Sequence, residues 1–212
     1  MQLYRTPFSP AYWRDALTDS KKVKPLVFSA LMVAVCVALS YARSIPIFYN
    51  IRVTWGFLGR ALCAMVCGPV NALAFGFVED TVSYFMNPDG GYNPAYVITT
   101  MLGVLTYALF LYRAKVTVTR LFLAKLVTNL QNVFLGSLWT YLWYTDQGYW
   151  AVVSASALKN VAMLPVQALL LVVLFSAMMP VLSVMGLTSR EADGLVTSRL
   201  IQWAKARRAA KS

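Results

Sequence analysis

Residues 53–86 read VTWGFLGRALCAMVCGPVNALAFGFVEDTVSYFM, and they decide how the rest of the chain is counted. Two apolar stretches, 53–67 and 69–86, are separated here only by Gly68-Pro69. They can form one long kinked helix or two helices joined by a tight turn. About 20 helical residues span the hydrocarbon core of a bilayer, so a single helix would greatly overshoot it. Because Gly-Pro interrupts helices, the sequence favours a helical hairpin.

Four further apolar stretches lie on either side of this pair. Hydrophobic residues make up 59% of the 212 positions and charged residues only 13%, which is typical of an integral membrane protein. We therefore predict an all-α membrane protein with six transmembrane helices. The other four predicted spans are 25–42, 95–112, 121–143 and 151–187.

Lysine and arginine placement predicts the orientation, because cytoplasmic loops carry the excess of cations. Basic residues precede the first span, separate the fourth from the fifth, and follow the sixth. Both termini are therefore expected in the cytoplasm, with three polar and aromatic linkers outside. These linkers are 43–52, 87–93 and 144–149. The predicted organisation is a cytoplasmic N-terminal amphipathic segment (1–24), a six-helix transmembrane domain (25–187) and a basic cytoplasmic tail (188–212).

The net charge of +11 does not indicate nucleic-acid binding, because the basic residues flank hydrophobic spans rather than forming a soluble domain. Anionic lipid of the inner leaflet explains them better. Segments 10–24 and 189–211 are polar and charged with scattered apolar positions, so each is expected to form a short amphipathic helix on the inner surface. We read the first span as an uncleaved helix of a multi-pass protein of the bacterial cell membrane.

Several chemistries lack the residues they require. The chain has no histidine, no CxxC pair and no phosphate-binding loop, and its three cysteines all fall within spans. The adjacent acids Glu79 and Asp80 point about 100° apart on a helix, which suits no catalytic acid/base pair. We expect no enzyme activity, no metal and no cofactor.

Three charged residues, Arg52, Asp80 and Lys159, lie in or at the rim of three different spans and on the same predicted side of the membrane. Charge is expensive in hydrocarbon, so such residues usually mark a functional cavity. Asp80 and Lys159 could instead neutralise one another as a buried pair. For Arg60, an ion pair with Glu79 or Asp80 is favoured over ligand contact, and Lys125 is expected to extend to cytoplasmic water.

The first span carries small residues at intervals of four, namely Ala30, Ala34 and Ala38. Such spacing makes one side of a helix narrow and lets another helix approach closely. Taken alone, this pattern more often serves packing within one protein.

Through these alanines and several other motifs, the chain resembles the substrate-binding S components of energy-coupling factor (ECF) vitamin transporters. The similarity is greatest to the folate-specific S components. The motifs that carry it are Phe48-Tyr49-Asn50-Ile51-Arg52, Gly68-Pro69, Asp80, Asn87-Pro88, Gly90-Gly91-Tyr92, 102–109, and Lys159-Asn160 with Pro165. One departure is that folate-type sequences tend to show Asn-Thr-x-Trp in helix five, whereas this chain reads Gly136-Ser137-Leu138-Trp139.

The resemblance implies a role and partners. The chain would capture folate or a reduced folate outside and dock through Ala30, Ala34 and Ala38 onto a transmembrane coupling protein driven by two ATPase subunits. Linkers 45–50 and 87–93 would act as gates, with Pro46, Tyr49, Gly90 and Gly91 as their key residues.

If the ligand is folate-like, each candidate site residue can be matched to one part of it. Asp80 could accept hydrogen bonds from the pterin, while Trp55, Tyr84 or Trp139 could stack on it. Arg52 and Lys159 could bind the carboxylates of the glutamate tail. Asn129, Asn132 and Asn160 are further polar candidates.

Other functions stay open at this point. An S component for another vitamin or for a queuosine-precursor-like ligand would share the fold. It would need no pair of cations, because such a ligand lacks a dianionic tail. A membrane scaffold of the rod-shape morphogenetic type would bind partners without a small ligand. A proton-coupled carrier is less favoured, because no inverted repeat is evident.

Overall fold

A computed structural model describes residues 2–4, 6–41, 45–48, 51–53, 55–86, 92–146 and 148–195 of the chain. The elements follow in the order α1 (Pro10–Asp19), α2 (Val23–Tyr41), β1 (Ile45–Phe48), β2 (Ile51–Val53), α3 (Gly56–Met86), α4 (Pro94–Leu111), α5 (Val118–Gln131), the π-helix η1 (Asn132–Gly136), α6 (Ser137–Trp143), α7 (Tyr149–Val184) and the 3₁₀ helix η2 (Arg190–Ala192). Five helical segments are long and apolar enough to cross a membrane: Val23–Ser40, Gly56–Met86, Pro94–Leu111, Val118–Trp143 and Tyr149–Val184.

Segment α3 is a helical hairpin rather than one rod. Arg60 Nε and Nη2 lie 2.9 and 3.1 Å from the two carboxylate oxygens of Glu79. In a continuous helix these residues would be about 28 Å apart, at 1.5 Å per residue. The chain must therefore reverse between them, and Gly68, with φ 76° and ψ 175°, is the non-helical residue. The predicted hairpin is confirmed. Because α3 contributes two helical arms, the five segments supply six rod-like helices.

Glycine is required at this turn for two reasons. The positive φ of Gly68 is a backbone conformation that other residues rarely adopt. In addition, a Cβ at Gly68 would lie 2.9 Å from the ring of Tyr112, which covers the turn. Pro69 then begins the second arm, where its fixed φ suits a first helical turn.

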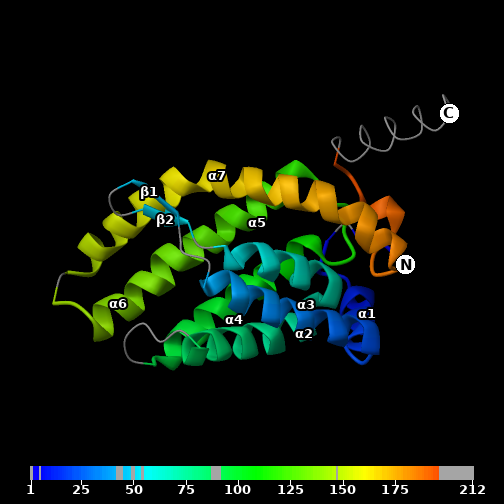
Figure 1. The fold of residues 1–212 in the computed structure, drawn as a ribbon, viewed down its shortest axis with the longest axis horizontal. Helices are drawn as coiled ribbons and strands as arrows, with labels where there is room; N and C mark the ends of the chain where they lie inside the picture. Colours follow the sequence, from blue (N-terminus) through cyan, green and yellow to red (C-terminus); the bar gives the residue numbers. More distant parts are fainter. Residues whose placement is uncertain are drawn as a thin grey trace.

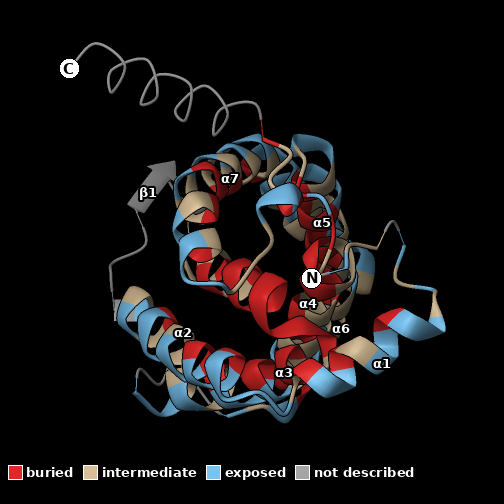
Figure 2. Ribbon diagram, turned by 90° about the vertical axis from the view of Figure 1, so that its right-hand side faces the viewer, coloured by how far each residue is buried: buried red, intermediate tan, exposed pale blue. Residues whose placement is uncertain are grey.

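The rods lie side by side along the long axis of the molecule (Figure 1). Helix α2 packs on α3, α3 on α4, α4 on α5, and α5 and α6 on α7. Viewed along the bundle, the buried faces of these helices turn inward (Figure 2). The first arm of α3 is the most enclosed segment, since residues 61–69 are all buried.

The two ends of the bundle are distinct. One end, which we call the α1 end, holds α1, the α4–α5 loop and the segment after α7 (Figure 1). The opposite end holds the hairpin of β1 and β2 and the connection from α6 to α7. We call it the hairpin end, after this β-hairpin and not after the helical hairpin of α3. Along the α5–α7 side, α5 continues into α6 through η1, so the predicted fifth span is one helix widened at its centre.

The fold is nearly all-helical, as predicted, with one exception near the hairpin end. Strands β1 and β2 pair antiparallel, with Pro46 opposite Arg52. The second span was expected from residue 53, directly after Arg52, but Arg52 and residue 53 lie in β2 and α3 begins only at Gly56. The physical reason is local, because 45–53 is rich in β-branched isoleucine and valine, which favour extended backbone.

An N-terminal helix forms where it was predicted, although it is shorter than the segment 10–24. Ser9 caps α1, its side chain accepting a hydrogen bond from the backbone N–H of Tyr12, and Pro10 takes the first helical position. Of the second predicted amphipathic segment, 189–211, the described part contains η2, while 196–211 lies outside the described residues.

Candidate ligand-binding site

The candidate ligand residues come from elements on several sides of the bundle. Trp55 directly precedes α3, Asp80 and Tyr84 lie in the second arm of α3, Trp139 lies in α6, and Lys159 and Asn160 lie in α7. Arg52 lies in β2 and the gate residue Pro46 in β1. The other predicted gate residues, Tyr49, Gly90 and Gly91, fall outside the described residues.

Asp80 is held by a neutral partner. The hydroxyl of Thr100 in α4 donates to Asp80 Oδ1 at 2.6 Å. No hydrogen bond to Oδ2 occurs within the described part of the chain, and no ion pair there joins Asp80 to Lys159. The alternative that these two charges neutralise one another is therefore not seen. The half-buried carboxylate has one oxygen positioned and one available.

Trp139 in α6 is fixed by Thr99, which precedes Thr100 in α4. Its indole Nε1 donates to Thr99 Oγ1 at 2.9 Å, and its ring centroid lies 5.6 Å from that of Trp143. Helix α4 thus holds Asp80 on its α3 side and Trp139 on its α6 side through consecutive threonines. This arrangement connects two of the predicted site residues through a common support.

Tyr84 belongs to an aromatic cluster at the end of α3. Its ring centroid lies 5.0 Å from that of Tyr92 and 5.8 Å from that of Phe85. Tyr92 immediately precedes Asn93, whose side chain caps α4. A planar ligand that stacked on Tyr84 would therefore also lie close to the rings of Tyr92 and Phe85.

On α7, the two candidate residues differ in exposure. Lys159 is exposed, whereas Asn160 is half-buried and donates to the backbone oxygen of Ser156 at 2.9 Å. The backbone oxygen of Asn160 accepts from Asn129 Nδ2 at 3.3 Å, which ties α7 to α5. Asn132, at the start of η1, is exposed.

Sequence reasoning named Asn129 as a polar candidate but missed the widening of the helix at η1 and the polar side chains of Gln131 and Ser137 beside it. Asn129 Oδ1, Gln131 Oε1 and Ser137 Oγ are buried without a hydrogen-bond partner in the described structure. Unpaired buried polar atoms are costly, and π-helical turns are frequent at functional sites. The departure at Gly136-Ser137 was the one signal of this feature in the sequence.

Two cations lie deeper in the bundle, the half-buried Arg60 and the buried Lys125. The predicted ion pair of Arg60 is confirmed, since its guanidinium contacts Glu79 through two hydrogen bonds. The expectation that Lys125 extends to water is wrong. Its side chain is 4% exposed and its Nζ lies 4.4 Å from the ring centroid of Phe57, because this face of α5 turns toward α3.

The three alanines of α2 form an uncovered strip. Ala30, Ala34 and Ala38 are all exposed. Another side of the same helix packs tightly, since a Cβ at Gly59 would lie 2.4 Å from Cys36 Sγ. The small residues at intervals of four therefore do not serve packing against α3.

Comparison with known proteins agrees with this architecture. Residues 20–180 match the family of ECF-type riboflavin transporter S components. The chain belongs to this family. It is also 28% identical over 154 residues to the folate transporter FolT of Clostridium novyi (strain NT), covering 71% of this chain and 87% of that protein. A crystal structure of FolT bound with folic acid matches with a TM-score of 0.62 and 25% identity, covering 71% of this chain and 91% of that one.

Membership has direct consequences. The chain is a multi-pass membrane protein of the transporter S-component class, and the family is one of transporter subunits rather than enzymes. The family description names riboflavin, whereas the curated relative is a folate transporter and the solved structure holds folic acid. The ligand must therefore be argued from the site.

Proposed function

We propose that the chain is the substrate-binding subunit of an ECF-type importer and captures folate or a reduced folate for ATP-driven uptake. The observation that carries this proposal is the match to a structure solved with folic acid, which covers 91% of that structure's chain and 71% of this one. Both termini lie in the cytoplasm and the hairpin end faces outward, in keeping with the basic residues around α1 and in the α4–α5 loop.

The pterin fits the Asp80–Trp139 side of the site. A pterin presents an amino group and a ring N–H on one edge, which a carboxylate accepts as a pair. Thr100 orients one oxygen of Asp80, and Trp139, held by Thr99, offers an aromatic face of fixed orientation. This pre-organisation reduces the cost of ordering the site on binding.

The glutamate tail requires cations near the outer, wetter end of the proposed site. Lys159 is exposed and makes no ion pair in the described structure, and Arg52 lies in β2 at the same end. Arginine can bind a carboxylate with two parallel hydrogen bonds, while lysine acts as a point charge. We assign these two residues to the tail, with Asn132 and Asn160 as further polar contacts.

Uptake requires partner subunits. The exposed strip of Ala30, Ala34 and Ala38 suits close approach of a helix of the transmembrane coupling protein. Two ATPase subunits then supply the energy, since this chain has no phosphate-binding loop. The subunit itself performs no catalysis and needs no metal or cofactor.

Riboflavin is the second candidate, favoured by the family description. An isoalloxazine ring would also stack on Trp139 and contact Asp80. Riboflavin has no carboxylate, however, and would leave Lys159 and Arg52 without a ligand partner. The cations at the hairpin end therefore favour folate.

The test is mass spectrometry and ultraviolet absorbance of the small molecules released from the detergent-purified protein, followed by calorimetry with folic acid, a reduced folate and riboflavin. We expect a stoichiometric pterin, or saturable binding of folates without riboflavin binding. A flavin in their place would keep the transporter class and overturn the ligand. Protein that binds neither would overturn both candidate ligands and leave another small molecule as the substrate of this S component.

A further inference from the structure

Helix α1 is held close to the plane where the chain enters the membrane. It ends at Asp19, and the apolar window of the first span begins at Val23, only four residues later. The lipid-facing side of that span starts at once, with Leu26 and Val27 more than half exposed. A helix tied so closely to the end of a span must lie at the level of the lipid headgroups.

The helix presents three different faces at this level. Tyr12 and Ala16 are 1% and 0% exposed and pack on the bundle, where the Tyr12 hydroxyl donates to the backbone oxygen of Ala108 at 3.2 Å. About 100° around the helix, Trp13 and Leu17 are 42% and 56% exposed. Beyond them lie the exposed polar residues Arg14 and Thr18. This order of bundle, apolar and polar faces is typical of an interfacial helix.

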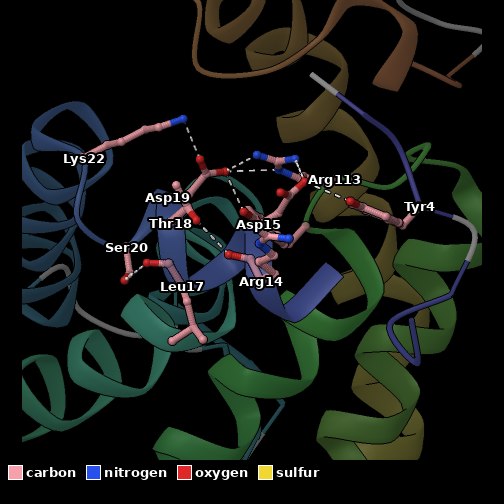
Figure 3. A network of polar contacts seen from close by, with 10 residues as sticks. Tyr4, Arg14, Asp15, Leu17, Thr18, Asp19, Ser20, Lys22 and Arg113 are labelled. Carbon is pink, nitrogen blue, oxygen red and sulfur yellow. Dashed lines mark hydrogen bonds and ion pairs between the residues drawn. The ribbon is translucent and has the colours of Figure 1, made fainter. Parts of the chain in front are cut away.

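A polar network fixes the rotation of α1. Arg113, after α4, forms ion pairs with both Asp15 and Asp19, contacting Asp19 through Nη2 at 2.6 Å. The Tyr112 hydroxyl donates to the same Asp19 oxygen at 2.6 Å. Figure 3 shows Asp15, Asp19 and Arg113 together, with Leu17 pointing away from them. Trp13 and Leu17 are thus held outward by contacts on the opposite side.

The surroundings of α1 are basic. Lys21 and Lys22 are exposed in the connection to α2, and Lys24 is exposed in the first turn of α2. Of these three, Lys22 forms an ion pair within the described structure, with Asp19 at 2.7 Å. A hollow of about 320 Å³ between this connection and the end of α7 is lined in part by Lys22, Lys24 and Arg113. Basic residues at this depth attract anionic headgroups, at about 1 kcal/mol each.

We propose that α1 is an interfacial membrane anchor that binds the anionic leaflet surface, with Trp13 and Leu17 among the upper acyl chains and Arg14, Lys21 and Lys24 at the phosphates. Its occupant is lipid, because the exposed apolar face of α1 continues directly into the lipid-facing surface of α2. Since Arg113 ties the helix to the end of α4, the anchor also sets how the bundle stands in the membrane.

The experiment compares two adjacent positions on different faces. Leu17→Cys and Thr18→Cys are each labelled with an environment-sensitive fluorophore and reconstituted into phosphatidylcholine vesicles with or without phosphatidylglycerol. The native Cys36, Cys63 and Cys67 are 0–1% exposed, and unlabelled wild-type protein checks that they stay unreactive. Folate binding, measured in parallel, shows that both labelled proteins are folded.

We expect the fluorescence emission of the label at position 17 to be blue-shifted relative to that at position 18. Nitroxide lipids should quench the label at position 17 at least about twofold more strongly. This quenching should increase when phosphatidylglycerol is present. Equal, weak quenching at both positions would place this face in water and overturn the anchor, leaving the face to a protein partner. Quenching independent of phosphatidylglycerol would overturn the role of anionic lipid.

Discussion

The two ends of the bundle treat charge in opposite ways. At the α1 end, Arg113 is shared by Asp15 and Asp19, and Asp19 also binds Lys22. At the hairpin end, Asp80 accepts from a neutral threonine and Lys159 is exposed. Charges that satisfy one another hold a fold together, whereas charges with spare capacity are ready for a ligand. Variants at the two ends should therefore separate stability from binding.

The largest effect is expected between the two ends, at the ion pair of half-buried Arg60 and buried Glu79 that joins the two arms of α3. Glu79→Gln leaves the Arg60 guanidinium without its counter-charge in the bundle, at a cost of about 3–5 kcal/mol. Thermal unfolding in detergent should show a large fall in Tm or loss of folded protein. The double variant Arg60→Met with Glu79→Leu is the matched control and should recover most of the loss. An unchanged Tm for Glu79→Gln would contradict a structural pair.

Asp80→Asn tests the hairpin end. The variant keeps the shape and a hydrogen-bond acceptor for Thr100, but it cannot accept a charge-assisted pair of bonds from the pterin. We expect folate binding to weaken roughly 100-fold, about 2–3 kcal/mol, with Tm nearly unchanged. Calorimetry and thermal unfolding on one preparation measure both quantities. A fall in Tm with intact affinity would assign Asp80 to the scaffold.

Asp19→Asn is the counterpart at the α1 end. Asp19 is 5% exposed and receives hydrogen bonds from Tyr112 and Arg113, so loss of its charge leaves the buried guanidinium poorly paired. We expect a loss of about 1–3 kcal/mol in stability and unchanged folate affinity. The same two measurements apply. If affinity fell with stability, the two ends would be coupled rather than independent.

Lys159→Ala sharpens the comparison on lysines alone. Removing one of two cations for the ligand tail should weaken folate binding about tenfold while leaving Tm unchanged. Lys115→Ala, an exposed lysine in the α4–α5 loop, is the matched control and should change neither. Equal effects on both variants would point to overall charge rather than a tail site. A ligand lacking the glutamate tail should bind the wild type and Lys159→Ala equally.

How much the sequence predicted differs between these regions for a physical reason. The spans and the hairpin at Gly68-Pro69 follow from hydrophobicity and backbone constraint, which act over a few residues. The β1–β2 pair was missed because membrane spans dominate the pattern around it. The contacts of Arg113 with Asp15 and Asp19 join residues 98 and 94 positions apart, and the burial of Lys125 depends on how α5 rotates against α3. Neither is encoded in local periodicity.

The smallest effect is expected from pH, and it concerns the α1 end alone. Burial by itself raises the pKa of Asp19, but hydrogen bonds from Lys22, Tyr112 and Arg113 outweigh it and hold the pKa below the usual 3.8. A carboxyl with a lowered folded-state pKa contributes stability that is present above 3.8 and lost as pH falls through the folded value. The Tm difference between wild type and Asp19→Asn should therefore stay constant from neutral pH down to about pH 5 and shrink below pH 4. A gap that persists in acid would mean that the side chain acts through its shape, and the network around Arg113 would then owe its stability to packing rather than charge.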